Sequence, residues 1–241
     1  MPKYFMNIYI SSLFDVFNTV ACFIAVLRLR RSHKQKPSVL VKDFFYFYLL
    51  FAIFFFFLAL PVIFHNNLRT VQLFFVIGHL ILYLALSYFT KILFALIGWK
   101  KFLLPLQSVL VATGIVVFVI SVQAFDSARV WEAGWNTYRL IAFSHGGAQW
   151  VRFLIGLVGG FSGLFFALVF GIQSLRLEDP FLRNRALWLA MGTFVLGLAA
   201  ISAFTFSVFA FYSFGIVLTA EVLAISGLLI MMIGIFYERE I

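Results

Sequence analysis

The charged residues of this chain are confined to a few short clusters, and the segments between them are almost wholly apolar. An α-helix needs about 20 residues to cross the roughly 30 Å hydrocarbon core of a bilayer, and these segments reach that length. Asp, Glu, Lys and Arg make up only 11% of the 241 residues. A soluble domain carries about 25%. The sequence therefore predicts one all-α integral membrane domain over 1–241, with the lipid bilayer as its surroundings.

The apolar segments predict a bundle of seven membrane helices. Residues 186–236 contain a single charge, Glu221. As one helix they would be about 76 Å long, so the chain must fold back once, and the aromatic and glycine residues at 211–215 are the expected turn. The predicted spans are 5–27, 43–64, 71–97, 102–124, 151–175, 186–208 and 212–236, with an outer loop at 125–150.

The distribution of basic residues predicts the orientation of the bundle. Positively charged loops stay in the cytoplasm. The connections after the first, third and fifth spans, with the segment after the seventh, hold thirteen of the 18 Lys and Arg residues. We therefore expect the N-terminus outside, the C-terminus inside, and the protein in the cell membrane as a multi-pass chain.

Five polar residues inside the spans are candidates for a site. Polar groups are costly in hydrocarbon and usually face the interior of a bundle. Asn18 follows Asp15 by three residues and Tyr83 follows His79 by four, so each pair shares a helix face. Counting residues from the span ends places Asp15, His79 and Glu221 at similar depths, about 10 Å below the outer boundary. The candidates are Asp15, Asn18, His79, Tyr83 and Glu221.

Two interpretations of these residues remain open. They form a ligand-binding or proton-sensing pocket, in which the acids attract a cationic ligand or share a proton with the histidine. Alternatively they are structural, and their hydrogen bonds hold neighbouring helices in register.

Stripes of small residues occur in spans five and seven. Small residues at helical spacing let two backbones approach closely. The stripes predict either packing inside the bundle or a homodimer seam. They comprise Gly156, Gly159, Gly160 and Gly163 in span five, and Ala220, Ala224 and Gly227 in span seven.

Span two is rich in phenylalanine, and Pro61 near its end predicts a kink. Phenylalanines spread around a helix define no cofactor site, so they are interpreted as lipid-facing bulk. Residues 125–150 are interpreted as a connector lying in the headgroup layer, with a short helix capped by Asp126 or Ser127, or as a lid over an outward-facing pocket.

No cofactor, metal site or enzymatic activity is predicted. Cys22 is the only cysteine, and the four histidines lie at different depths. Span seven contains no lysine that could bind retinal. No phosphate loop or nucleophile motif occurs. The net charge of +9 is explained by basic residues in the connections predicted to face the cytoplasm, so no nucleic acid is expected as a partner.

Seven spans, an outside N-terminus, about 235 residues and Leu-Arg-Leu-Arg-Arg at 27–31 closing span one resemble the N-terminal sensory modules of bacterial membrane histidine kinases. The resemblance covers nearly the whole chain in layout. It implies a sensor-like or receptor-like module that signals through a cytoplasmic or membrane partner protein.

Two other functions remain open. An accessory subunit of a membrane complex would be held by its glycine stripes. A small transporter would resemble the SWEET and PQ-loop carriers in span number, but the chain lacks their Pro-Gln signature, and spans one, five and six contain no proline. We therefore expect continuous helices without an unwound segment, in a bundle that shifts only by small tilts.

Overall fold

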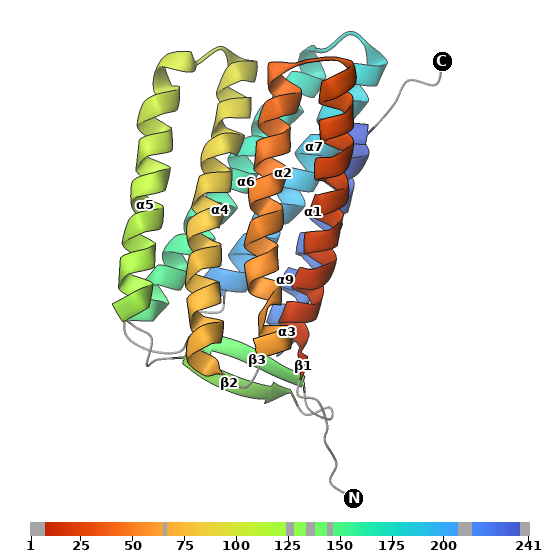
Figure 1. The fold of residues 1–241 in the computed structure, drawn as a ribbon. Coiled ribbons are helices and arrows are strands. Elements are labelled where there is room, and N and C mark those ends of the chain that lie inside the picture. Colours follow the sequence, from red (N-terminus) through yellow and green to blue (C-terminus); the bar gives the residue numbers. More distant parts are fainter. Residues whose placement is uncertain are drawn as a thin grey trace, which may run out of the picture.

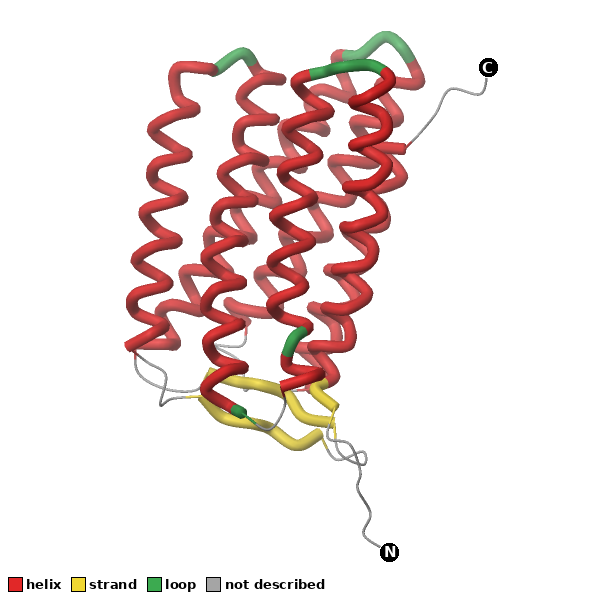
Figure 2. The backbone as a smooth tube through the Cα atoms, in the orientation of Figure 1, coloured by secondary structure: helices red, strands yellow, loops and turns green. Residues whose placement is uncertain are grey.

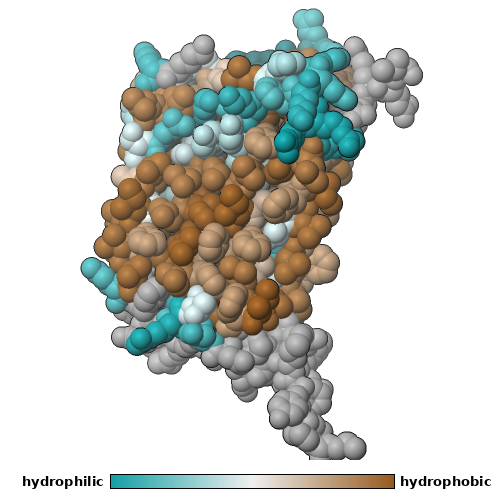
Figure 3. All heavy atoms as spheres, viewed as in Figure 1, coloured by the Kyte–Doolittle hydropathy of each residue, from teal (hydrophilic) through white to brown (hydrophobic). Residues whose placement is uncertain are grey.

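The computed structural model describes residues 8–64, 67–123, 128–133, 138–143, 147–206 and 214–236. Within these residues, seven helices are long and apolar enough to cross a membrane, as the sequence predicts. On the face seen in Figure 3, apolar side chains form a broad belt across the middle of the bundle, and polar side chains gather at the upper end. The chain is thus a multi-pass helical bundle with the character of a membrane protein.

The helices form two layers (Figure 1). The front layer contains α1 (Ile10–Gln35), α2 (Val39–Ala59), α4 (Leu68–Ile97) and α5 (Leu103–Gln123). The back layer contains α6 (Gly147–Arg176), α7 (Pro180–Ala200) and α9 (Phe214–Phe236). Neighbours in sequence pack against each other, and α1 contacts α9, so the first and last helices join the layers at one edge.

The two ends of the bundle differ. The connections 36–38, 98–102 and 177–179 lie together at the end that carries most basic residues, here named the basic end (Figure 2). The short 3-10 helix η1 (Lys100–Phe102) belongs to this end. The opposite end carries a three-stranded sheet in the order β1-β3-β2, and is named the sheet end.

The sheet corrects the expectation of a short helix in the loop 125–150. Strands β2 (Ala128–Ala133) and β3 (Tyr138–Phe143) form an antiparallel hairpin, and β1 (Ile8–Tyr9) pairs with β3 in parallel. The segment 128–133 contains Val130 and Trp131, and β-branched and aromatic residues of this kind are enriched in strands. The expected capping residues, Asp126 and Ser127, lie outside the described residues.

Two helix boundaries differ instructively from those predicted. Helix α1 continues to Gln35 instead of ending at 27, so the basic cluster extends the helix beyond the apolar segment. Helix α7 begins at Pro180 instead of 186, where Asp179 accepts a hydrogen bond from the Phe181 amide at 2.9 Å and Pro180 occupies the first turn. Residues 211–213 of the expected turn lie outside the described residues.

Within the described residues each span is one continuous helix, as expected, but spans two and six depart from regular α-helix. In span two the helical hydrogen bonding is interrupted after Leu60, and Pro61 begins the short helix α3 (Pro61–Phe64), because proline cannot donate the helical hydrogen bond; Leu60 itself keeps right-handed helical angles. Span six passes from α7 into a π-helical segment, η3 (Ile201–Phe206). Such segments are rare and occur frequently at functional sites.

Candidate functional site

Asp15 faces the interior of the bundle from α1. The buried residues of this helix recur every three or four positions, at Ser12, Asp15, Asn18 and Cys22, so they form one inward stripe. Asp15 is only 5% exposed, whereas its neighbour Phe17 is 66% exposed on the lipid-facing side. The spacing noted in the sequence thus places the carboxyl group inside the protein.

Glu221 approaches the same place from α9. It is partly accessible, and Ala220 beside it is 4% exposed. Because α1 packs against α9, the acidic side chains from the two ends of the chain border the same space. The structure therefore joins the two acids that the sequence singled out.

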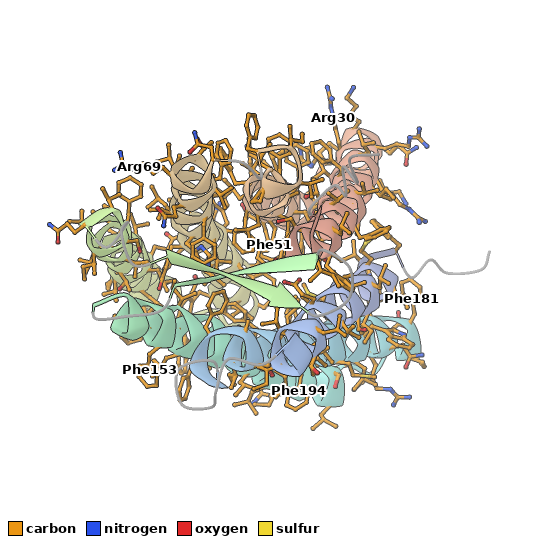
Figure 4. All side chains as sticks on the ribbon, turned by 90° about the horizontal axis from the view of Figure 1, so that it is seen from below. Arg30, Phe51, Arg69, Phe153, Phe181 and Phe194 are labelled. Carbon is orange, nitrogen blue, oxygen red and sulfur yellow. The ribbon has the colours of Figure 1, made fainter. Side chains whose placement is uncertain are left out.

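Both acids line two adjoining cavities between the layers. The first, of about 140 Å³, lies toward the middle of the bundle. The second, of about 100 Å³, lies toward the sheet end and includes Ser11, Ser12 and Pro61. Seven phenylalanines line the first cavity: Phe47, Phe51, Phe54, Phe55, Phe89, Phe166 and Phe204. Seen from the sheet end, Phe51 lies in the interior between the helical layers (Figure 4).

The residues that line these cavities include two acids and three hydroxyl-bearing side chains, and the others are apolar. None of the described residues that line them is basic. Thr193 is the other polar residue of the first cavity, and its hydroxyl donates to the Leu189 carbonyl at 2.8 Å within its own helix. A buried charge without a partner is costly. The arrangement therefore suits a cation entering from outside or a proton shared between the carboxyl groups.

His79 is buried beside phenylalanines that line the two cavities. Its ring lies 4.0 Å from that of Phe75, 5.7 Å from that of Phe54 and 5.4 Å from that of Phe204, measured between centroids. Its Nδ1 lies 2.7 Å from the Phe75 carbonyl oxygen. His79 is 1% exposed and is not among the described residues that line the cavities. A phenylalanine layer thus lies between the histidine and the cavities.

The remaining polar candidates are buried elsewhere. Tyr83 packs with Val117 and Ile155, and its Cβ atom lies close to Gly114 of α5. Asn18 is fully buried one turn from Asp15, but it is not among the described cavity residues. Among the described residues, no hydrogen-bond partner meets the Asn18 amide or the Tyr83 hydroxyl.

The glycines of span five lie in the contact between α6 and α7. A Cβ at Gly163 would lie 2.5 Å from the Gly197 Cα, one at Gly159 would lie 3.2 Å from the Ala200 Cβ, and one at Gly160 would meet Ile201. Gly156 is buried in the same helix. The two backbones approach most closely where Gly163 meets Gly197, because neither residue carries a side chain there.

The small residues of span seven divide between two roles. Gly227 lies against Gly192 and Leu196 of α7, where an added Cβ would be 3.0 Å from the Gly192 carbonyl oxygen. Ala220 and Ala224 line the first cavity beside Glu221. Small side chains in α9 therefore leave room for the acidic group as well as for a neighbouring helix.

The interpretation of the span-two phenylalanines as lipid-facing bulk is wrong for most of them. Phe44, Phe47, Phe51, Phe54 and Phe55 are each at most 8% exposed, whereas Phe56 is 48% exposed. The spacing of three and four between the first four defines an inward face, and that periodicity was the available signal. The π-helical segment, which brings Ala203 and Phe204 to both cavities, has no comparable signal in the sequence.

Comparisons with known proteins identify no relative: no family model, curated protein or solved structure matches the chain. Within the described residues, no three His, Cys, Asp or Glu side chains gather in a cluster that could hold a metal ion. The site is therefore interpreted from its own geometry.

Proposed function

We propose that this chain is a sensor-like or receptor-like membrane module that binds a small organic cation and signals through a partner protein. The observation that carries the proposal is the meeting of Asp15 and Glu221 in a cavity whose other walls are phenylalanine rings and small residues. Negative charge attracts the ligand, and the apolar walls select an organic cation over a strongly hydrated ion.

The phenylalanine rings support the choice of a cation. The face of an aromatic ring attracts a positive charge, most strongly where water is excluded, and quaternary ammonium groups are commonly bound by aromatic cages. A cavity of about 150 Å³ in another protein binds benzene. The 140 Å³ cavity here is therefore suited to a group the size of tetramethylammonium.

The back layer favours a sensor over a carrier. Its backbones meet at Gly163 and Gly197 and at Gly192 and Gly227, contacts that leave little room for sliding. The acids also lie on the sheet-end side of α1 and α9, whereas carriers hold substrate near the midplane. Ligand binding would cause small tilts at the α1–α9 edge. A partner protein would respond to these tilts, and no path through the bundle would open.

A transporter is the second candidate, and one observation favours it. Both departures from regular α-helix, at Leu60 and at Ile201–Phe206, lie next to the cavities, since Pro61, Ala203 and Phe204 line them. Broken helices beside a binding site are a feature of carriers. Uptake of tetramethylammonium into vesicles, abolished by Asp15→Asn, would establish the carrier and reject the sensor.

The sensor proposal requires the sheet end to face outward and the basic end to face the cytoplasm. The clustering of Lys and Arg supports this orientation. Reporter fusions after Lys34, Trp135, Arg183 and Glu240 test it. We expect residue 135 outside and the other three positions inside; a cytoplasmic residue 135 would contradict the proposal.

Binding of radiolabelled tetramethylammonium to the purified chain tests the site. Asp15→Asn and Glu221→Gln should each weaken binding about tenfold or more, because a charge-assisted contact is lost in an apolar cavity. Glu178→Gln is the matched control, since this acid is exposed at the basic end. tert-Butyl alcohol, of similar shape but uncharged, should not compete. Equal binding by all variants would refute the proposal.

A further inference from the structure

A third hollow lies at the basic end, far from the two acidic cavities. It is a groove of about 830 Å³ between α1, α7 and α9, bounded by the start of α2. Its cationic residues are Arg28, Arg31, Lys36 and Arg185, and none of the described residues that line it is acidic. The excess of basic residues at this end accounts for positive charge in general, but not for its concentration around one groove.

The groove changes from apolar to cationic along one helix. On α1, Arg28 follows Ile24 by four residues and Arg31 follows Leu27 by four, so each arginine stands one turn beyond an apolar side chain on the same face. Ile24 is 52% exposed and Leu27 is 62% exposed. A molecule lying here would meet hydrocarbon-facing side chains at one end and guanidinium groups at the other.

Two of the arginines are held in place by the end of α9. The Arg185 side chain donates from Nε to the Gly234 carbonyl and from Nη2 to the Ile235 carbonyl, both at 3.1 Å. The Arg28 guanidinium carbon lies 4.4 Å from the centre of the Phe236 ring. Cations at a helix C-terminus are favoured by its partial negative charge. These contacts fix the guanidinium groups beside the groove.

We propose that this groove binds the headgroup of an anionic phospholipid. The phosphate would lie among Arg28, Arg31 and Arg185, with an acyl chain along Ile24 and Leu27. Arginine suits phosphate because its planar guanidinium group donates two parallel hydrogen bonds. Basic pockets between helices at the cytoplasmic side of membrane proteins bind lipid headgroups in this way.

The experiment compares two double variants of equal charge. Arg31→Gln with Lys36→Gln removes two cations that line the groove, whereas Arg30→Gln with Lys34→Gln removes two exposed cations of α1 that do not line it. Binding of fluorescent phosphatidylglycerol to the full chain is measured in a neutral detergent, where no charged membrane surface contributes. Phosphatidylcholine serves as the neutral lipid.

We expect the groove variant to bind phosphatidylglycerol at least tenfold more weakly, because charge-assisted contacts with the phosphate are lost, and the control to stay within twofold of the parent chain. Phosphatidylcholine and glycerol phosphate should not displace the bound lipid. Equal losses in both variants, or displacement by glycerol phosphate alone, would overturn the proposal. It also fails if phosphatidylglycerol binds only after Glu238→Gln with Glu240→Gln, because the chain's own acidic segment would then be the occupant.

Discussion

The front and back layers of the bundle pack by opposite means. In the front layer, large aromatic side chains fill the space between helices: the rings of Phe47 and Phe89 stack with centroids 4.4 Å apart across α2 and α4. In the back layer, glycines lie at the closest contacts between helices, and the α6 and α7 backbones meet at Gly163 and Gly197. Both solutions supply van der Waals contact, which must replace the hydrophobic effect within a bilayer.

The difference explains where the acidic cavity forms. Phenylalanines of α2 and α4 form its wall on the front side, and small residues of α6, α7 and η3 form most of the wall opposite, among them Gly159, Gly163, Gly197, Ala200 and Ala203. Where rings face small residues across the two layers, space remains. Asp15 and Glu221 enter that space at the edge where α1 and α9 join the layers.

The largest effect is expected from Gly163→Leu in the back layer. A Cβ alone would lie 2.8 Å from the Gly197 amide nitrogen and 3.0 Å from the Thr193 carbonyl oxygen, so the backbones must separate. We expect a loss of more than about 3 kcal/mol in the free energy of unfolding, because overpacking against backbone cannot be relieved by a change of rotamer. Denaturant unfolding in detergent micelles measures it.

Gly171→Leu is the matched control for this variant. Gly171 lies in the same helix, and no atom lies within 4 Å of a Cβ added there. The control should be as stable as the parent chain or slightly more so, since glycine weakens a helix interior by about 1 kcal/mol relative to alanine. Similar losses in both variants would show that the close approach of α6 and α7 is wrong.

Much of the fold could be predicted from the sequence because membrane spans depend on local composition. Charge clusters mark the connections, and a length of about 20 apolar residues marks each span. The proximity of Asp15 and Glu221 was harder to predict. Similar residue depth is consistent with proximity, but it does not show that α1 and α9 are neighbours. His79 has a depth similar to theirs, yet Phe54, Phe75 and Phe204 surround it. Depth follows from residue counting, whereas the direction in which a helix faces depends on its partners.

A smaller effect is expected from Phe47→Ala in the front layer. Phe47 is 2% exposed and stacks on both Phe89 and Phe51. In a soluble protein such a truncation costs about 3–5 kcal/mol. Lipid chains are as apolar as the protein core, so only the lost packing contributes. We therefore expect the free energy of unfolding to fall by about 2 kcal/mol.

Phe56→Ala provides the comparison for this truncation, because Phe56 is 48% exposed on the same helix. Its unfolding free energy should change by less than about 0.5 kcal/mol, as expected for substitution away from packed contacts. If both variants unfold like the parent chain, aromatic stacking does not hold the front layer together.

The smallest effect concerns the ion pair that links α2 to α4 near the basic end. The Lys91 ammonium donates to the Asp43 carboxylate at 2.7 Å, with the Asp43 side chain 4% exposed and that of Lys91 40% exposed. Lys91→Gln leaves a buried carboxylate without its cation, whereas Asp43→Asn leaves a lysine that can reach water. Because Lys91 is solvent-accessible, we expect only about 1 kcal/mol of destabilisation from Lys91→Gln and less from Asp43→Asn, measured by thermal unfolding of both variants in one detergent. The asymmetry follows from the unequal burial of the partners, so a larger loss in Asp43→Asn would show that the aspartate reaches solvent and the front layer is looser than the stacked rings imply.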